Sequence, residues 1–112
     1  MIRLTQRADF LKAAKAQYQA KPGVVVQARA RGDDDETIRL GFTATKKIGN
    51  AVARNRAKRR LREAARALVP GLGLAGHDYV LIARATTGSA PWQGLLDDVK
   101  AALIRLARAK TQ

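Results

Sequence analysis

Side chains able to act in acid–base or nucleophilic catalysis are scarce in this sequence. The 112 residues include one histidine, His77, and no cysteine. This composition excludes disulfides, thiolate zinc sites and cysteine nucleophiles. His77 lies in an expected glycine-bounded loop, and a general base needs partners within hydrogen-bond reach that we cannot identify around it. We therefore interpret His77 as a loop residue and predict no catalytic residue in this chain.

Acidic side chains gather once, at Asp33, Asp34, Asp35 and Glu36, which are four of the nine acids. Such a run could attract a divalent cation. It lacks the ligand spacing and the turn glycine of a calcium loop. We interpret it as the solvated tip of a hairpin and predict no protein-bound metal.

Basic side chains are the most informative feature of the chain. Between residues 46 and 66, nine of them oppose one acid, Glu63, so this segment carries +8 of the formal charge of +13. The nine are Lys46, Lys47, Arg54, Arg56, Lys58, Arg59, Arg60, Arg62 and Arg66. A cluster of this charge predicts a polyphosphate partner, RNA or DNA.

The same segment reads as an amphipathic helix from Ala51 to Leu68 that Pro70 and Gly71 end. Its apolar stripe follows helical spacing: Ala57, Leu61, Ala64, Ala65 and Leu68. Beside the stripe, like charges repeat at i, i+4, which costs a few tenths of a kcal/mol per pair until an anion neutralises them. An ordinary solvated face interleaves Glu with Lys, so we predict nucleic-acid binding here.

Other elements must position this helix. Thr5 is an expected N-cap of a first helix that carries Leu11, Ala14 and Tyr18 and ends at residues 21–23, Lys-Pro-Gly. A strand is expected from Val24 to Arg29, followed by the acidic hairpin loop at 32–36.

A second strand is expected over residues 38–46, where alternation is clean. One face carries Ile38, Leu40, Phe42 and Ala44, and the other, expected to be open, carries Arg39, Gly41, Thr43 and Thr45. Residues 79–83 read as a buried strand. A final helix follows Pro91 and is marked by Leu95, Val99, Ala102, Leu103 and Leu106.

These elements predict a fold in the α+β class, as a single domain spanning residues 1–112. The expected order is helix-strand-strand-helix-strand-helix, with a sheet of about three to four strands packed against helices. We see no signal peptide and no apolar run of the roughly 20 residues needed to span a membrane. The expected location is the cytoplasm, and no membrane partner is expected because the basic helix lacks Trp and Phe.

Residues 46–63, KKIGNAVARNRAKRRLRE, closely resemble the signature of the protein subunit of bacterial ribonuclease P. The resemblance extends to Arg7-Ala8-Asp9-Phe10, similar to the family's first helix, and to residues 76–80, similar to the entry of its last strand. In that family an RNA is the catalyst: it holds Mg²⁺ and cleaves the 5′ leader from precursor tRNA. The resemblance implies that this chain binds the catalytic RNA and the leader, and that no protein residue is catalytic.

Carried over by residue, the resemblance assigns the helix face and the lysines before it to the catalytic RNA. These RNA-binding residues are Lys46, Lys47, Arg54, Asn55, Arg56, Lys58, Arg59 and Arg62. It implies a leader-binding cleft that includes Phe10, with Thr43 and Thr45 on the strand face. Ala14 and Gln27 stand where relatives often have aromatic residues, so stacking on the leader is expected to be weaker or to involve other residues.

Two alternatives use the same charge. A ribosomal protein that stabilises rRNA also needs a small basic α+β domain, and without residues 46–63 the two could not be separated. A helix-turn-helix protein that binds DNA is disfavoured because no second helix lies within a three- or four-residue turn of the basic one.

Overall fold

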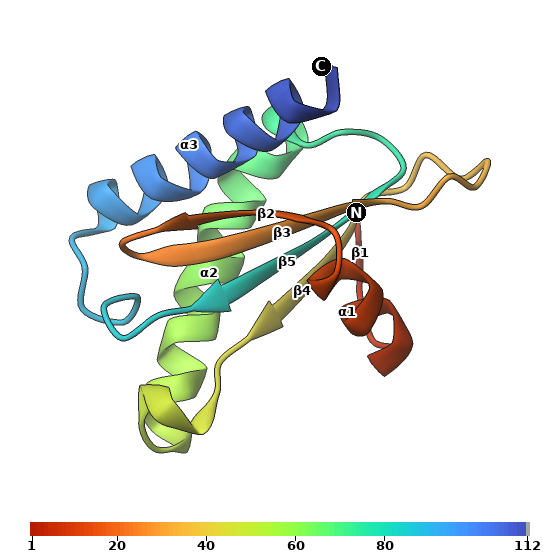
Figure 1. Cartoon of the computed structure of the whole chain (residues 1–112). Helices are drawn as coiled ribbons and strands as arrows, with labels where there is room; N and C mark the ends of the chain where they lie inside the picture. The colour runs from red at the N-terminus through yellow and green to blue at the C-terminus, as the bar shows by residue number, and fades with distance from the viewer. Residues whose placement is uncertain (112) are drawn as a thin grey trace.

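One β-sheet separates a short helix from two long ones in the computed structural model of the chain, which describes residues 1–111 and the side chains of residues 1–109 (Figure 1). The elements, in chain order, are β1 (Ile2–Arg3), α1 (Arg7–Ala14), β2 (Gln17–Lys21), β3 (Val24–Ala30), β4 (Arg39–Thr43), the 3₁₀ turn η1 (Lys46–Ile48), α2 (Ala51–Leu72), β5 (His77–Ala83) and α3 (Trp92–Thr111). The α+β class is confirmed.

The sheet has five strands in the order β1-β4-β5-β3-β2, more than the three to four we predicted. The two missed strands are β1, which has only two residues, and β2. The expected hairpin between residues 24–29 and 38–46 is wrong, because β5 lies between β3 and β4 and pairs with both, antiparallel to β3 and parallel to β4. Residues 31–38 are therefore a connection across the end of the sheet and not a hairpin tip.

The first helix is shorter than its pattern suggested. It begins after Gln6 and not at Thr5, and it ends at Ala14. Leu11 and Tyr18, placed by the pattern on a buried stripe, are 51% and 63% exposed. The residues that bury α1 are Ala13 and, in part, Phe10.

The Pro-Gly pair at residues 22–23 closes a β-hairpin where we expected the end of a helix. Two contacts from distant segments hold this turn: the Gly23 N–H donates to Asp98 Oδ2 at 2.9 Å, and the Thr87 hydroxyl donates to the Gly23 carbonyl at 2.6 Å. Proline and glycine stop helices and form turns equally well, so local sequence did not distinguish the two.

Helices α2 and α3 pack on one face of the sheet and form the main core. The predicted stripes are confirmed: Leu61 and Ala64 of α2 and Leu95, Val99 and Leu103 of α3 are fully buried. On the opposite face α1 covers a smaller cluster of Leu4, Ala13 and Val80. The face of β4 that we expected to be open is therefore partly covered, since Gly41 is buried.

Both ends of α2 have a physical cause. The Asn50 side chain accepts a hydrogen bond from the Ala53 N–H at 2.9 Å and caps the N-terminus. Pro70 lies in the last turn, where it removes only one backbone bond, and the Gly73 N–H still donates to the Val69 carbonyl at 2.8 Å. The helix thus runs to Leu72, four residues beyond the predicted end.

Candidate nucleic-acid interface

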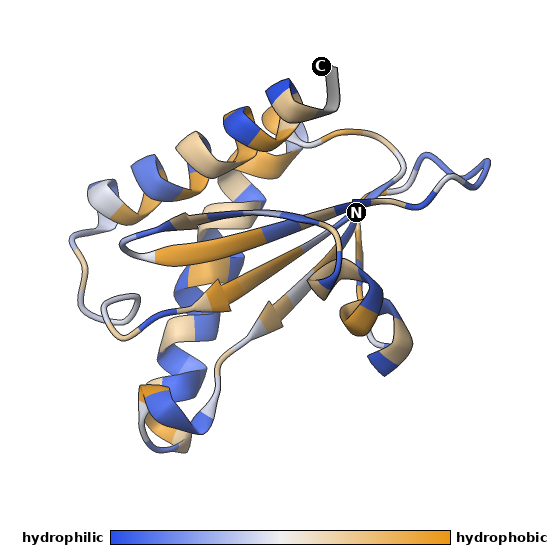
Figure 2. Cartoon of the chain, in the orientation of Figure 1, coloured by the Kyte–Doolittle hydropathy of each residue, from blue (hydrophilic) through white to orange (hydrophobic). Residues whose placement is uncertain are grey.

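The basic side chains of α2 flank its buried stripe on the side of β4 and on the solvent side. Asn55, Arg56 and Arg59 are exposed, and Arg54, Lys58 and Arg62 are half-buried. Lys46 and Lys47 are exposed on η1, directly before the helix. Figure 2 shows the N-terminal half of α2 as mostly hydrophilic. The structure thus places all eight predicted RNA-binding residues on η1 and on residues 54–62 of α2, and their role in binding stays a prediction.

Arg60 differs from the other cations of the helix. Its guanidinium donates to the carbonyls of Thr87 and Ala90 at 2.7 and 2.6 Å, and it lies 5.7 Å from the ring centre of Trp92. These contacts fasten α2 to the loop before α3. Arg60 therefore has a structural role, which its position in the basic run did not reveal.

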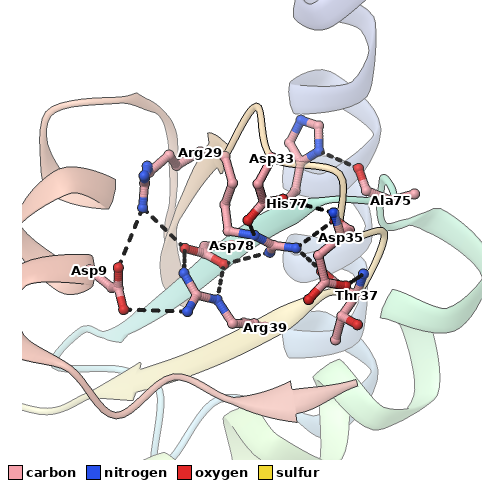
Figure 3. A network of polar contacts seen from close by, with 10 residues as sticks. Asp9, Arg29, Asp33, Asp35, Thr37, Arg39, Ala75, His77 and Asp78 are labelled. Atoms are coloured by element: carbon pink, nitrogen blue, oxygen red, sulfur yellow. Dashed lines mark hydrogen bonds and ion pairs between the residues drawn. The ribbon is translucent and has the colours of Figure 1, made fainter.

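A network of ion pairs joins α1 to the sheet (Figure 3). At its centre lies Asp78, whose side chain is fully buried. Arg39 donates to both carboxylate oxygens of Asp78 at 2.7 Å, and Arg31 donates to one of them at 2.9 Å. Arg29 and Arg39 also reach Asp9 of α1, at 3.6 and 3.4 Å.

The network determines the charge state of its members. Burial alone would raise the pKa of the Asp78 carboxyl, but the hydrogen bonds from Arg39 and Arg31 outweigh it and hold that pKa below its usual value. The same hydrogen bonds, which Arg39 donates to Asp78, raise the pKa of Arg39. The arginines of this network are thus paired within the fold, in contrast to Arg54, Arg56 and Arg59 of α2.

Asp9 is followed by Phe10, so the network also positions the aromatic ring. A Cβ atom on Gly41 would lie 2.6 Å from Cε1 of Phe10, which shows that the ring rests directly on the Gly41 backbone. No larger residue at position 41 would allow this approach without moving the ring. Phe10 is half-buried in this position.

The exposed side of Phe10 lines a hollow at the edge of β4. The hollow is lined by Thr5, Arg7, Phe10, Phe42, Thr43, Ala44 and Lys58. Two of the three predicted leader-binding residues, Phe10 and Thr43, therefore meet there with a cation of α2. Thr45 does not line the hollow; it is exposed at the start of η1.

Tyr18 is an exposed aromatic residue on β2, in a segment whose pattern predicted a helix. It pairs with Gln27 across the β2–β3 hairpin, and Gln27 pairs with Val80, which packs beneath α1. Side chains in register share a face of the sheet, so Tyr18 lies on the same face as Phe10. Alternation of residues 17–21 was the only available signal for it.

His77 is on strand β5 and not in a loop, so that expectation was wrong. It is almost fully buried, its ring stacks on Tyr79 at 6.1 Å between centres, and Nδ1 lies 2.9 Å from the Ala75 carbonyl oxygen. These contacts fit a structural role. Within the described residues, no three His, Cys, Asp or Glu side chains form a group that could hold a metal ion.

Comparison with known proteins decides the family. The sequence model described as Ribonuclease P matches residues 1–107. The chain belongs to the ribonuclease P protein family. It is 62% identical over 105 residues to the ribonuclease P protein component of Caulobacter vibrioides (strain NA1000 / CB15N), covering 94% of this chain and 70% of the relative. It is 57% identical over 109 residues to the ribonuclease P protein component of Ruegeria pomeroyi, covering 96% of this chain and 87% of the relative.

Solved structures agree with this assignment. The RNase P protein of Staphylococcus aureus superposes with a TM-score of 0.77 at 30% identity, covering 95% of this chain and 94% of the other. The RNase P protein of Thermotoga maritima superposes with a TM-score of 0.76 at 30% identity, covering 92% of this chain and 96% of the other.

Family membership confirms the resemblance seen in residues 46–63. It makes the chain a component of an endoribonuclease with an RNA partner, a cofactor protein in tRNA processing. The reading as a ribosomal protein is not favoured. No helix in the described part of the chain is long and apolar enough to cross a bilayer.

Proposed function

We propose that this chain binds a catalytic RNA through the basic face of α2 and the leader of precursor tRNA through the hollow at Phe10. The RNA supplies the Mg²⁺ ions and the hydrolysis of the phosphodiester bond, in the cytoplasm. The observation that carries the leader site is the meeting of Phe10, Thr43 and Lys58 in one hollow. A flat ring, a hydroxyl and a cation suit an unpaired nucleotide without a fixed base code.

The charge distribution supports a division of the surface. Arg29, Arg31 and Arg39 are paired with carboxylates on the α1 side of the sheet. Arg54, Arg56 and Arg59 have no ion pair within the described residues. Because unpaired cations gain most from phosphate contacts, we assign the docking of the large RNA mainly to Arg54, Arg56 and Arg59 of α2 and to η1.

Tyr18 completes the leader-binding face in this proposal. It offers an exposed ring on the face where Ala14 and Gln27 replace aromatic residues of relatives. Base stacking tolerates any sequence, which a protein that handles many precursors requires.

Leader length is the variable that tests the proposal. Affinity is measured for precursor tRNAs with leaders of about one and about eight nucleotides. Each substrate is tested with the catalytic RNA alone and with the reconstituted holoenzyme. We expect the protein to strengthen binding of the long-leader substrate and to have little effect on the short one. An equal gain for both substrates would show that the protein acts only through the catalytic RNA.

A further inference from the structure

A second hollow lies next to the Phe10 hollow, on the α2 side of the β4 edge. Its cavity volume is about 190 Å³, and its lining includes Ile2, Arg3, Leu40, Phe42, Arg62 and Arg66. Phe42 lines both hollows. Arg3 pairs in register with Leu40, so its side chain lies on the face of the sheet that α2 covers.

Three guanidinium groups surround this hollow without a carboxylate in its lining. Arg66 is 75% exposed and reaches only Glu63, at 3.7 Å, on the solvent side of α2. Arg3 and Arg62 have no ion pair within the described residues. Such a gathering of like charge is unfavourable until an anion enters it.

The base of the hollow is apolar, because Leu40 and Phe42 project into it from β4. This lining favours a ligand that combines an anionic group with a weakly polar one. A nucleotide of a single-stranded RNA has this chemistry.

The two hollows share a wall. Lys58 lines the first, and Arg62 and Arg66 line the second, so the wall is one i, i+4 row of α2. Successive members of the row lie about 6 Å apart along the helix axis, because each step spans four residues at 1.5 Å each. One short extended strand can therefore contact both hollows in succession.

We propose that the Arg3–Arg62–Arg66 hollow is a second nucleotide subsite for the leader of precursor tRNA. A phosphate binds between the guanidiniums, and the base lies against Leu40 and Phe42. The inference rests on the proposed leader site at Phe10 and extends it around the edge of β4.

The test uses the double variant Arg3→Ala/Arg66→Ala in the reconstituted holoenzyme. Arg105→Ala is the matched control, because Arg105 is exposed on α3, which packs under β2 and β3 and away from the hollow. Affinity is measured for precursor tRNAs with leaders of about one, three and eight nucleotides. We expect the double variant to bind the longest leader about fivefold more weakly per lost contact near 0.1 M salt, with a salt slope flatter by about 0.7 per contact.

The outcomes separate the two proposals. Loss confined to the longest leader, with Arg105→Ala unchanged, supports the subsite. Equal loss at every leader length assigns the hollow to the catalytic RNA, and no loss shows that it binds nothing; either result overturns the subsite while the Phe10 site stands. A wild-type protein without any dependence on leader length overturns both.

Discussion

At the scale of single residues, two sets of contacts position the hollow at Phe10. The Phe10 ring rests on the Gly41 backbone, and the Asp78 carboxylate accepts hydrogen bonds from Arg39 and Arg31. Phe10 is half-buried, so it contributes to the fold and presents a ring to the hollow at once. The predictions at this scale separate these two contributions.

Replacing Phe10 with Ala is expected to reduce long-leader affinity by about 1–3 kcal/mol, the loss of one stacked base. The short-leader affinity should change little. Binding of both substrates by the reconstituted holoenzyme gives the ratio of long-leader to short-leader affinity, and thermal unfolding measures stability. A variant that melts earlier yet keeps the wild-type ratio would show that Phe10 serves only the core.

Gly41→Ala tests the position of the Phe10 ring through the backbone on which the ring rests. The new Cβ must displace the Phe10 ring, so we expect a stability loss of about 1–3 kcal/mol from overpacking and a weaker preference for long leaders. Gly71→Ala is the control, because nothing lies within 4 Å of a Cβ at that position. An unchanged leader preference in Gly41→Ala would contradict the position assigned to the ring.

Asp78→Asn tests the ion network. It removes the buried carboxylate that pairs with Arg39 and Arg31 and leaves them only Asp9 and Asp33, and breaking a buried pair costs about 3–5 kcal/mol. The folded pKa of Asp78 lies below its unfolded value near 4. Its stabilisation is therefore complete above about pH 4 and is lost as the pH falls through the folded pKa. Urea unfolding should show a large difference between wild type and variant near neutral pH and a smaller one at acid pH; a constant difference would exclude this origin.

At the scale of elements, α2 combines a stripe that builds the core with the cations that we propose as the RNA-docking surface. Arg60 shows that adjacent arginines of one helix serve different purposes, since it fastens the loop before α3. Helix spacing alone explains which side chains are buried, and contacts with other elements explain which cations remain available.

The double variant Arg54→Ala/Arg56→Ala is expected to weaken binding to the catalytic RNA and to flatten the salt slope by about 0.7–0.9 per lost contact. Its unfolding free energy should change by about 0.5 kcal/mol or less. Arg60→Ala should instead lower the free energy of unfolding by about 1–3 kcal/mol and leave the salt slope of RNA binding nearly unchanged.

Leu61→Asp is the control for loss of fold, because it places an unpaired charge in the core. RNA affinity across a salt series and chemical unfolding distinguish these variants. If the Arg54→Ala/Arg56→Ala variant bound RNA with the wild-type affinity and the wild-type salt slope, the N-terminal part of α2 would not be a docking surface for the catalytic RNA.

At the scale of the whole molecule, residues 46–66, which include η1 and most of α2, carry +8 of the formal charge of +13. If the chain binds a leader beside a catalytic RNA, as proposed, this charge offsets the repulsion between the two polyanions and lowers the need for Mg²⁺.

We expect RNA-free protein to leave precursor tRNA intact with or without Mg²⁺, because its single histidine is buried in structural contacts. Catalytic RNA should restore leader removal, at a lower Mg²⁺ concentration with the protein than without it. Chelation should abolish it. Cleavage by nuclease-free, RNA-free protein would contradict the cofactor role.

The sequence by itself determined the basic face, the stripes of the two long helices and the family, because these depend on residue type and on periodicity within one element. Ala57, Leu61 and Leu103 were predicted as core from spacing alone and are buried. Tertiary structure decided what depends on distant partners. Strand β5 separates β3 from β4 only because its pairing with segments about 40 to 60 residues away is more favourable than a local hairpin. Residues 17–21 form a strand and not a helix because β3 offers backbone partners there. The meeting of Phe10, Thr43 and Lys58 follows from that packing, since no spacing in the chain relates a first helix, a strand edge and a second helix.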